Sequence, residues 1–372
     1  MKRPPLDYHF AGEEELDSPA LIFYEDIIEE NIQKAITIAG GTDRMWPHVK
    51  TYKAAAVVRL LLAQGIKRFK CATIAEAEMC AQCGASHILI AYPLIGPAIR
   101  RFIELRQRYT ASVFWAAGDD TEPLSLLGAA AGAAGPAVPF LVDVNPGMNR
   151  TGVALEGGLL KDFCLRAGKI PGLNLMGFHC YDGNLGIKDS GERERAVAEE
   201  TQKLMAAREA VEAEGRKLPV MVMGGTPTFP FHARNRDVFL SPGTFFIQDH
   251  GYDSKYRDLS FTPGAAILTR VISRPREDLF TLDLGYKAIA SDQEGERGVI
   301  TDLPEARPEA HSEEHWVFRM TGGNCPPLGT ILQVIPTHIC PTTALYPGGY
   351  VVRDRRLVNY WEISARNRKI TI

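Results

Sequence analysis

The sequence has 372 residues, of which 45% are apolar and 23% charged, as in ordinary globular proteins. The net charge of −3 gives no sign of a nucleic-acid or anionic-membrane partner, and no apolar run approaches the roughly 18 residues that a membrane span needs. The first residues contain no apolar signal region, so we expect a cytoplasmic protein.

Seven cysteines are scattered along the chain, an odd number that argues against a disulfide framework. Cys80 and Cys83 form a single C-x-x-C within a stretch that is typical of a helix, and no second Cys/His pair lies nearby. We interpret them as buried helix thiols rather than as a metal or redox site.

Short apolar runs alternate with helical stretches between about residues 45 and 245. The predicted strands are at 45–51, 69–74, 88–93, 112–117, 140–145, 175–181, 220–226 and 238–244. The helical stretches are at 54–66, 75–83, 97–109, 122–134, 155–167 and 192–214, with a shorter one after Pro227. Eight such β-α units favour an α/β fold, a (β/α)8 TIM-type barrel. An open doubly wound sheet is the alternative, although no G-x-G-x-x-G follows the first strand.

The pattern changes near Phe261, beyond which strand-like runs and turn clusters dominate. These strands are at 266–272, 279–284, 315–320, 330–336, 350–353 and 357–363. The pattern predicts a C-terminal antiparallel β domain, to which Ala20–Tyr24 adds a strand. We therefore expect a barrel at 25–256 and a β domain made of 1–24 and 257–372.

Polar side chains gather where the predicted barrel strands end. Lys50 ends the first strand, Arg150 follows the fifth, and His179 and Tyr181 end the sixth. The carboxyl ends of parallel barrel strands meet at one face, where active sites lie. Arg150 could hold a phenolate oxygen or a carboxylate, or could pair with Asp143 as a structural loop residue. Each signal alone is weak, but the shared placement favours a site at this face.

Two glycine-threonine pairs end the last two predicted barrel strands, Gly225-Thr226 and Gly243-Thr244. Glycine lets backbone N–H groups approach an anion closely, and the threonine hydroxyl adds a donor. Barrels often bind phosphate at this position, although two ordinary turns are an equally weighted alternative. Together with the lysine on the same face, these pairs support the hypothesis that Lys50 holds pyridoxal phosphate as a Schiff base.

His338 and Cys340 are separated by one residue near the end of a predicted strand. In an extended segment, side chains at positions i and i+2 point the same way. An imidazole nitrogen and a thiolate could then bind one Zn²⁺ or a similar divalent ion. Two ligands are too few for a closed site, so water, substrate or a distant ligand would be needed. Chance spacing is the alternative.

Seven segments together carry a resemblance to a known family. They are Pro47–Thr51, Gly147–Gly152, His179–Gly183, Gly224–Thr228, Ser241–Thr244, Glu313–His315 and Pro336–Thr342. The chain resembles the metal-dependent D-threonine aldolases and the zinc-dependent D-serine dehydratases, which are pyridoxal-phosphate enzymes with the alanine-racemase fold. It departs from the family pattern at Trp46, Tyr52 and Asn184, where the family commonly has arginine, histidine and histidine.

The resemblance implies a cofactor bound to Lys50 and contacted by Arg150 and Tyr181. It further implies phosphate binding by the glycine-threonine loops at 225–226 and 243–244. The metal would lie on His338 and Cys340, with zinc preferred over manganese or magnesium.

The resemblance also implies a reaction on D-β-hydroxy-α-amino acids in a homodimer. Retro-aldol cleavage to glycine and an aldehyde is favoured, with His179 or a metal-bound hydroxide as the base. The alternative is a β-elimination that gives ammonia and a 2-oxo acid, in which Lys50 removes the α-proton. An amino-acid racemase and a non-catalytic cofactor carrier are further alternatives.

Overall fold

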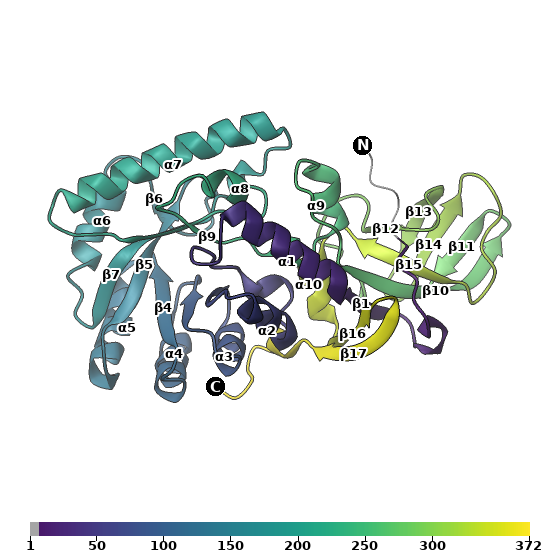
Figure 1. Cartoon of the computed structure of the whole chain (residues 1–372), viewed down its shortest axis with the longest axis horizontal. Helices are drawn as coiled ribbons and strands as arrows, with labels where there is room; N and C mark the ends of the chain where they lie inside the picture. Colours follow the sequence, from purple (N-terminus) through teal and green to yellow (C-terminus); the bar gives the residue numbers. More distant parts are fainter. Residues whose placement is uncertain (1–6) are drawn as a thin grey trace. The chain divides into compact units, whose positions relative to one another are not determined.

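The computed structural model of the protein describes residues 7–372 (Figure 1). The described chain divides into two units, and each is described by itself. Unit 1 contains residues 7–34, 51–56 and 244–366, and unit 2 contains residues 35–50, 57–243 and 367–372. The domain boundaries expected from the sequence stay a prediction, and the first six residues lie outside the described part of the chain.

A sheet of parallel strands forms the centre of unit 2 (Figure 1). Its order along the sheet is β2-β3-β4-β5-β7-β8-β9, with β6 paired to β5. The strands are β2 (Arg68–Cys71), β3 (His87–Ile90), β4 (Val113–Gly118), β5 (Val138–Asn145), β6 (Val153–Ala154), β7 (Leu173–Cys180), β8 (Val220–Met223) and β9 (Phe239–Leu240). Apart from β6, each strand corresponds to a predicted one.

Residues 45–48 close this sheet into a barrel. Met45 pairs with Leu240 of β9, and His48 pairs with Lys70 of β2, both in parallel. The backbone N–H of Lys70 also donates to the carbonyl of Pro47 at 2.8 Å. The predicted (β/α)8 barrel is confirmed, but its first strand ends earlier than expected. Val49–Thr51 instead form a single 3₁₀ turn, η2.

Helices alternate with these strands as predicted. They are α2 (Ala55–Ala63), α3 (Ile74–Gln82), α4 (Pro97–Arg108), α5 (Thr121–Ala134), α6 (Leu159–Ala167), α7 (Ser190–Glu212) and α8 (Phe229–His232). Side chains of Thr73, Asp120 and Asp189 accept backbone N–H groups in the first turns of α3, α5 and α7, which satisfies donors that a helix leaves free. Within residues 7–372, no helix is both long and apolar enough to cross a membrane.

The helix α1 (Glu25–Ala39) was not predicted from the sequence. Its side chains Ile28, Ile32, Ala35 and Ala39 are buried. Their spacing of three to four residues is the helical period, so the signal was present in the sequence.

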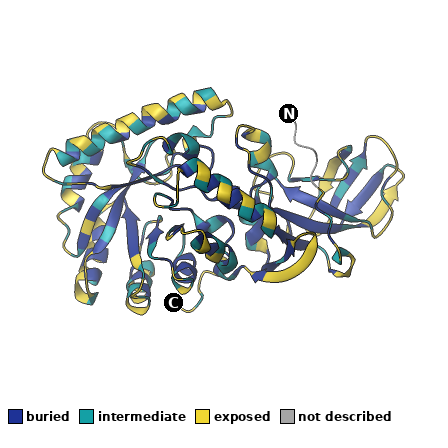
Figure 2. Ribbon diagram, in the orientation of Figure 1, coloured by how far each residue is buried: buried dark blue, intermediate teal, exposed yellow. Residues whose placement is uncertain are grey.

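Aromatic and aliphatic side chains fill the barrel interior, and Figure 2 shows the barrel strands as largely buried. Trp46 is 1% exposed and its indole N–H donates to the carbonyl of Phe69 at 2.8 Å. Its ring packs edge-on against Trp115 with ring centroids 5.3 Å apart. Trp46, which stands where the resembled family commonly has arginine, is therefore a core residue of the barrel.

Unit 1 contains a mostly antiparallel sheet, as predicted (Figure 1). Its order is β13-β14-β11-β10-β1-β16-β17, and β15 pairs with β10 and β12. The strands are β1 (Ala20–Tyr24), β10 (Ala265–Arg276), β11 (Leu279–Leu282), β12 (Gly298–Ile300), β13 (Ala306–His311), β14 (Trp316–Met320), β15 (Ile331–Pro336), β16 (Gly348–Arg353) and β17 (Arg356–Glu362). The predicted N-terminal strand β1 lies between β10 and β16, whereas β12 and β13 were not predicted.

The segment that follows β15 is helical at Cys340, so the prediction of an extended segment there was wrong. The helix α10 (Ile339–Leu345) begins directly after His338. The buried carboxylate of Asp249 accepts the Ile339 N–H at 3.1 Å, and the Thr342 hydroxyl donates to the carbonyl of His338 at 2.7 Å. Pro341 is tolerated because it lies in the first turn, where its missing N–H has no helical partner.

All seven cysteines are free, as predicted. Cys80 is buried on α3, and Cys83 is half-buried at the C-terminal end of that helix. The interpretation as a buried helix thiol is confirmed for Cys80, whereas Cys83 directly follows the last residue of α3 and is only half-buried.

Replacing Trp46 with alanine should destabilise the protein by about 3–5 kcal/mol, because the change leaves a cavity in the barrel core. Urea denaturation checks this value. Leu126→Ala serves as the control because Leu126 is 58% exposed, and it should change stability by less than about 0.5 kcal/mol. Equal, small effects of the two substitutions would contradict the assignment of Trp46 to the core.

Candidate active site

Three cationic groups lie around the ring of Tyr181 in unit 2. The Nζ atoms of Lys50 and Lys70 lie 5.7 Å and 5.9 Å from the ring centroid, and the guanidinium carbon of Arg150 lies 5.0 Å from it. Lys50 and Tyr181 are half-buried, whereas Arg150 is exposed on its loop. The structure therefore brings three residues predicted from the sequence together and adds Lys70. This group favours an anionic ligand at its surface.

A chain of three side chains crosses the barrel interior at this level. The Nδ1 atom of His179 lies 2.7 Å from a carboxylate oxygen of Asp143, and its Nε2 atom lies 3.3 Å from Nζ of Lys70. These residues come from β7, β5 and β2, and all three are buried. Asp143 thus pairs with His179, and both ring nitrogens of the predicted base have partners.

The pKa values in this chain follow from burial and neighbouring charge. Burial and the charge of Lys70 lower the pKa of His179, and the carboxylate of Asp143 opposes them. Burial and the charge of Lys50 lower the pKa of Lys70 to about 7. Burial raises the pKa of Asp143, but hydrogen bonding and charge from His179 outweigh it and lower the pKa. The His179 ring is therefore neutral at neutral pH.

Asp182 fixes one of the glycine loops. One of its oxygens accepts the N–H of Gly225 at 3.1 Å, and the other lies 2.7 Å from Nε2 of His232. Asp182 and His232 are each 1% exposed. Because a buried carboxylate needs partners on both oxygens, this pair holds the Gly225 backbone in one position.

The two predicted phosphate loops are neighbours at residues 225–226 and 243. The N–H of Gly243 points to the Thr226 hydroxyl oxygen at 3.5 Å. A Cβ atom at Gly243 would lie 2.8 Å from the carbonyl oxygen of His48, so only glycine fits there. The hydroxyl of Ser241 is buried and has no hydrogen-bond partner among the described residues. An orphaned donor beside two glycine loops, in a unit with the cations around Tyr181, fits a phosphorylated ligand with a carbonyl group for Lys50.

Cys340 lies against two threonines within unit 1. Its sulfur is 3.2 Å from the Thr51 hydroxyl and 3.6 Å from the Thr244 hydroxyl. Thr51 directly follows Lys50 in the chain, and Thr244 directly follows Gly243. The predicted cofactor residue Thr244 is thus a neighbour of the predicted metal ligand Cys340.

His338 carries a carboxylate partner on one ring nitrogen. Its Nδ1 atom lies 2.6 Å from a carboxylate oxygen of Asp292. Burial lowers the pKa of His338, but hydrogen bonding and charge at Cys340 and Asp292 outweigh it and raise the pKa to about 9. A carboxylate on Nδ1 orients the ring and leaves Nε2 for a metal, as in many metal sites.

The donor set of His338 and Cys340 fits an open metal site with two protein ligands. Nitrogen and sulfur are the ligands that zinc prefers. Among the described residues, no group of three or more His, Cys, Asp or Glu side chains is arranged to hold a metal. The remaining positions would therefore be filled by water or substrate.

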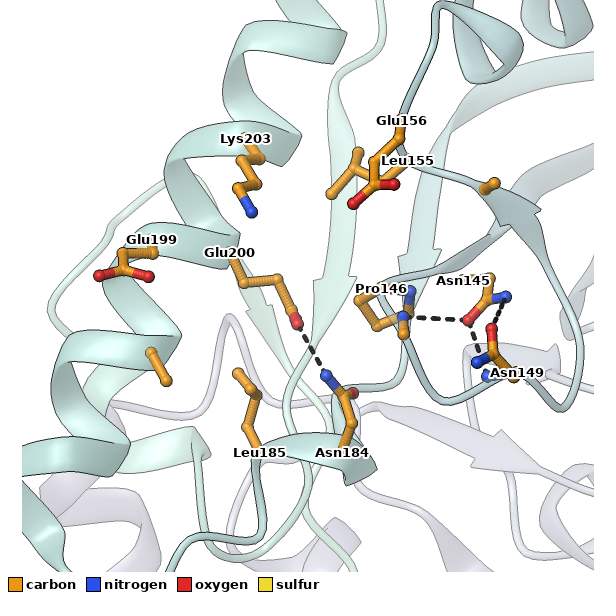
Figure 3. A pocket seen from close by; sticks show the side chains of 13 residues that line it. Asn145, Pro146, Asn149, Leu155, Glu156, Asn184, Leu185, Glu199, Glu200 and Lys203 are labelled. Carbon is orange, nitrogen blue, oxygen red and sulfur yellow. Dashed lines mark hydrogen bonds between the residues drawn. The ribbon is translucent and has the colours of Figure 1, made fainter.

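A cavity of about 260 Å³ lies in unit 2, beside the loop at 147–152 that carries Arg150. Figure 3 shows Asn184 and Glu200 pointing toward one another in its wall, with Nδ2 of Asn184 3.5 Å from a carboxylate oxygen of Glu200. Burial, followed by the charge of Asp182, raises the pKa of Glu200 to about 7. Asn184, a departure from the resembled family pattern, therefore shapes this cavity.

Sequence reasoning missed Lys70, Asp249 and Asp292 as residues of these sites. Lys70 had a signal, because it is a charged residue inside the apolar run of β2. Asp249 and Asp292 lie 89 and 46 residues before His338 in the sequence, and no local pattern links them to it.

Comparison with known families supports the fold. The profile described as "Alanine racemase, N-terminal domain" matches residues 25–247, which is more than half of the chain. The chain belongs to this family. A second profile, described as "Putative serine dehydratase domain", matches residues 264–352 of this family member.

Several named relatives match this chain over nearly its full length. This chain is 28% identical over 358 residues to a D-threonine aldolase of Arthrobacter sp., and the match covers 94% of this chain and 93% of the relative. It is 25% identical to the D-threo-3-hydroxyaspartate dehydratase of Delftia sp. (strain HT23), over 93% of this chain and 97% of the relative. The crystal structure of a D-threonine aldolase from Filomicrobium marinum superposes with a TM-score of 0.88 at 25% identity, covering 98% of this chain and 99% of that one.

Asp182→Ala should destabilise the protein by about 3 kcal/mol, because it leaves Nε2 of the buried His232 ring without its acceptor and leaves the Gly225 N–H with the Thr228 hydroxyl alone. Urea denaturation measures the loss. Asp182→Asn keeps one acceptor oxygen and should lose less. The exposed Asp237 provides the control, since Asp237→Ala should leave stability within about 0.5 kcal/mol. A small effect of Asp182→Ala would show that this carboxylate does not fix the loop.

Proposed function

We propose that this protein is a lyase that acts on D-β-hydroxy-α-amino acids with pyridoxal 5′-phosphate on Lys50 and a divalent metal on His338 and Cys340. The favoured reaction is retro-aldol cleavage to glycine and an aldehyde. Elimination to ammonia and a 2-oxo acid is the second candidate. Both activities occur among relatives that cover more than nine-tenths of the chain, and an aldolase has the higher identity.

The group of cations around Tyr181 is the observation that carries the proposal. Lys50 presents a half-buried amine at the carboxyl end of the barrel, which suits covalent attachment to an aldehyde. Arg150 on the same ring suits the phenolate oxygen of the cofactor, and the loops at Gly225 and Gly243 suit its phosphate. When bound, the cofactor supplies an electron sink for the bond that breaks at Cα.

Lys50 and His179 are the proposed catalytic residues. Nζ of Lys50 would hold the cofactor, and when it is not bound to it this amine could carry a proton. In the elimination, Nζ of Lys50 takes the α-proton. His179 keeps a proton at Nδ1 against Asp143, and its Nε2 lone pair, which faces Nζ of Lys70 at 3.3 Å, could take a proton as a general base once that contact opens.

His338 and Cys340 are the proposed metal ligands, with zinc the preferred ion. The carboxylate of Asp292 orients the imidazole of His338, and the Thr51 and Thr244 hydroxyls lie against the sulfur of Cys340. A metal there would lower the pKa of a bound hydroxyl group, which is the group that both reactions must activate.

We also propose a homodimer. The strand β17 lies at the edge of the unit 1 sheet, and its side chains Leu357, Val358 and Tyr360 are 40–53% exposed. An exposed apolar edge strand is a common interface for a second copy of the same chain.

Product analysis tests the proposed reaction. Cofactor-loaded protein is incubated with D-threonine, D-serine and D-3-hydroxyaspartate, and the products are separated as glycine or as ammonia with a 2-oxo acid. We expect glycine from D-threonine, and L-threonine serves as the control that should give no product. Ammonia with a 2-oxo acid would support the second candidate, and no product from any substrate would contradict the proposal.

Metal binding can be tested separately from turnover. His338→Ala and Cys340→Ala should each lower the bound zinc measured by elemental analysis, because each removes one of only two protein ligands. His315→Ala is the matched control, since His315 is exposed. EDTA should abolish turnover, and zinc should restore it. Full metal content in both ligand variants would refute this pairing.

A further inference from the structure

Lys70 is a buried lysine that the proposed reaction does not use. It is 3% exposed on β2, between Phe69 and Cys71, which are both fully buried. Lysine is almost never fully buried unless it has a partner. Its Nζ lies 3.3 Å from Nε2 of His179, so this histidine is that partner.

The contacts of His179 decide where its protons lie. The carboxylate of Asp143, 2.7 Å from Nδ1, can only accept, so Nδ1 must donate. A charged ammonium can only donate, so Nε2 must accept from Lys70. The two partners therefore select the neutral imidazole that carries its proton on Nδ1.

The same contact between Lys70 and His179 allows a second placement of the proton. When Nζ of Lys70 is an uncharged amine, it can accept an N–H from Nε2, and His179 is then an imidazolium. The N–H bond at Nζ breaks, the N–H bond at Nε2 forms, and the total charge of the pair stays the same. The pair can therefore hold one proton in two places without exchange with solvent.

The charges that face Lys70 reduce the free-energy difference between these two states. Burial and the cations of Lys50 (η2) and Arg150 (the loop after β5) lower the pKa of Lys70 to about 7. The carboxylates of Asp182 (after β7) and Asp143 (β5) oppose this shift. Lys70 thus loses its proton far closer to neutral pH than a lysine in water does.

We propose that Lys70 is a positioning residue for His179. It donates to Nε2, holds the ring as the neutral Nδ1–H tautomer, and shares one proton with it. The effect of this role on catalysis rests on the proposed function, because His179 acts on substrate only if the reaction takes place at the carboxyl ends of the barrel strands.

Nuclear magnetic resonance of ¹⁵N-histidine in the cofactor-loaded protein tests the proposal without turnover. In the native protein, we expect His179 to show a protonated Nδ1 and a bare Nε2 at neutral pH. Lys70→Met removes the cation and keeps an unbranched buried side chain. It should raise the pKa of His179 by about one unit or more, because the charge that opposed the imidazolium is gone while Asp143 remains.

Two further variants separate charge from packing. Lys70→Arg keeps a cation with N–H donors and should restore the neutral ring. Lys67→Met is the matched control, because Lys67 is exposed and lies just before β2. It should leave the His179 signals unchanged. An unchanged pKa and tautomer of His179 in folded Lys70→Met, or a ring that stays charged in folded Lys70→Arg, would overturn the proposal.

If Lys70→Met does not fold, measurements on the native protein still test the proposal. With ¹⁵N-lysine incorporated as well, the signals of His179 and of Lys70 Nζ should change together over one pH range, since the two groups share a proton. An isolated histidine titration, with no change at Lys70, would overturn the proposal. Neither readout requires a product, so a failed product assay and a failed Lys70 role give different results.

Discussion

The pairing of residues 45–48 with two strands at once is the constraint on which the rest of the site depends. This short segment pairs with β9 at Met45 and with β2 at His48, and the His48 N–H donates to the carbonyl of Pro242 at 2.8 Å. The chain must then turn at η2, which sets Lys50 at the carboxyl end of the barrel. The same pairing lays the carbonyl of His48 against Gly243. One strand therefore positions both Lys50 and the loop at Gly243 that is proposed to bind phosphate.

The buried polar side chains above the barrel core stabilise one another through hydrogen bonds and opposite charges. Buried ions are costly unless they are paired and hydrogen-bonded. Asp143 and Asp182 each contact a histidine, and Lys70 contacts His179 from the opposite side. Below these side chains, Trp46 and Trp115 fill the barrel with apolar groups. The polar residues are thus confined to the end of the barrel where a ligand can use them.

Strand and helix alternation was enough to predict the barrel, because each β-α unit is a local pattern. The positions of Lys50, Arg150, His179 and Tyr181 at strand ends followed from that pattern. The contact between Lys70 and His179 did not, because the two residues are 109 positions apart and their pairing depends on strand order. The same limit explains the helix at Cys340, whose start depends on the carboxylate of Asp249, 90 residues before Ile339.

The proposed function depends on which lysine holds the cofactor, since Lys50 and Lys70 both lie within 6 Å of the Tyr181 ring centroid. Borohydride reduction of the cofactor-loaded protein fixes pyridoxal phosphate on the lysine that carries it, and mass spectrometry of the peptides identifies that lysine. We expect the label on Lys50. A label on Lys70 or Lys53, or none at all, would contradict this assignment.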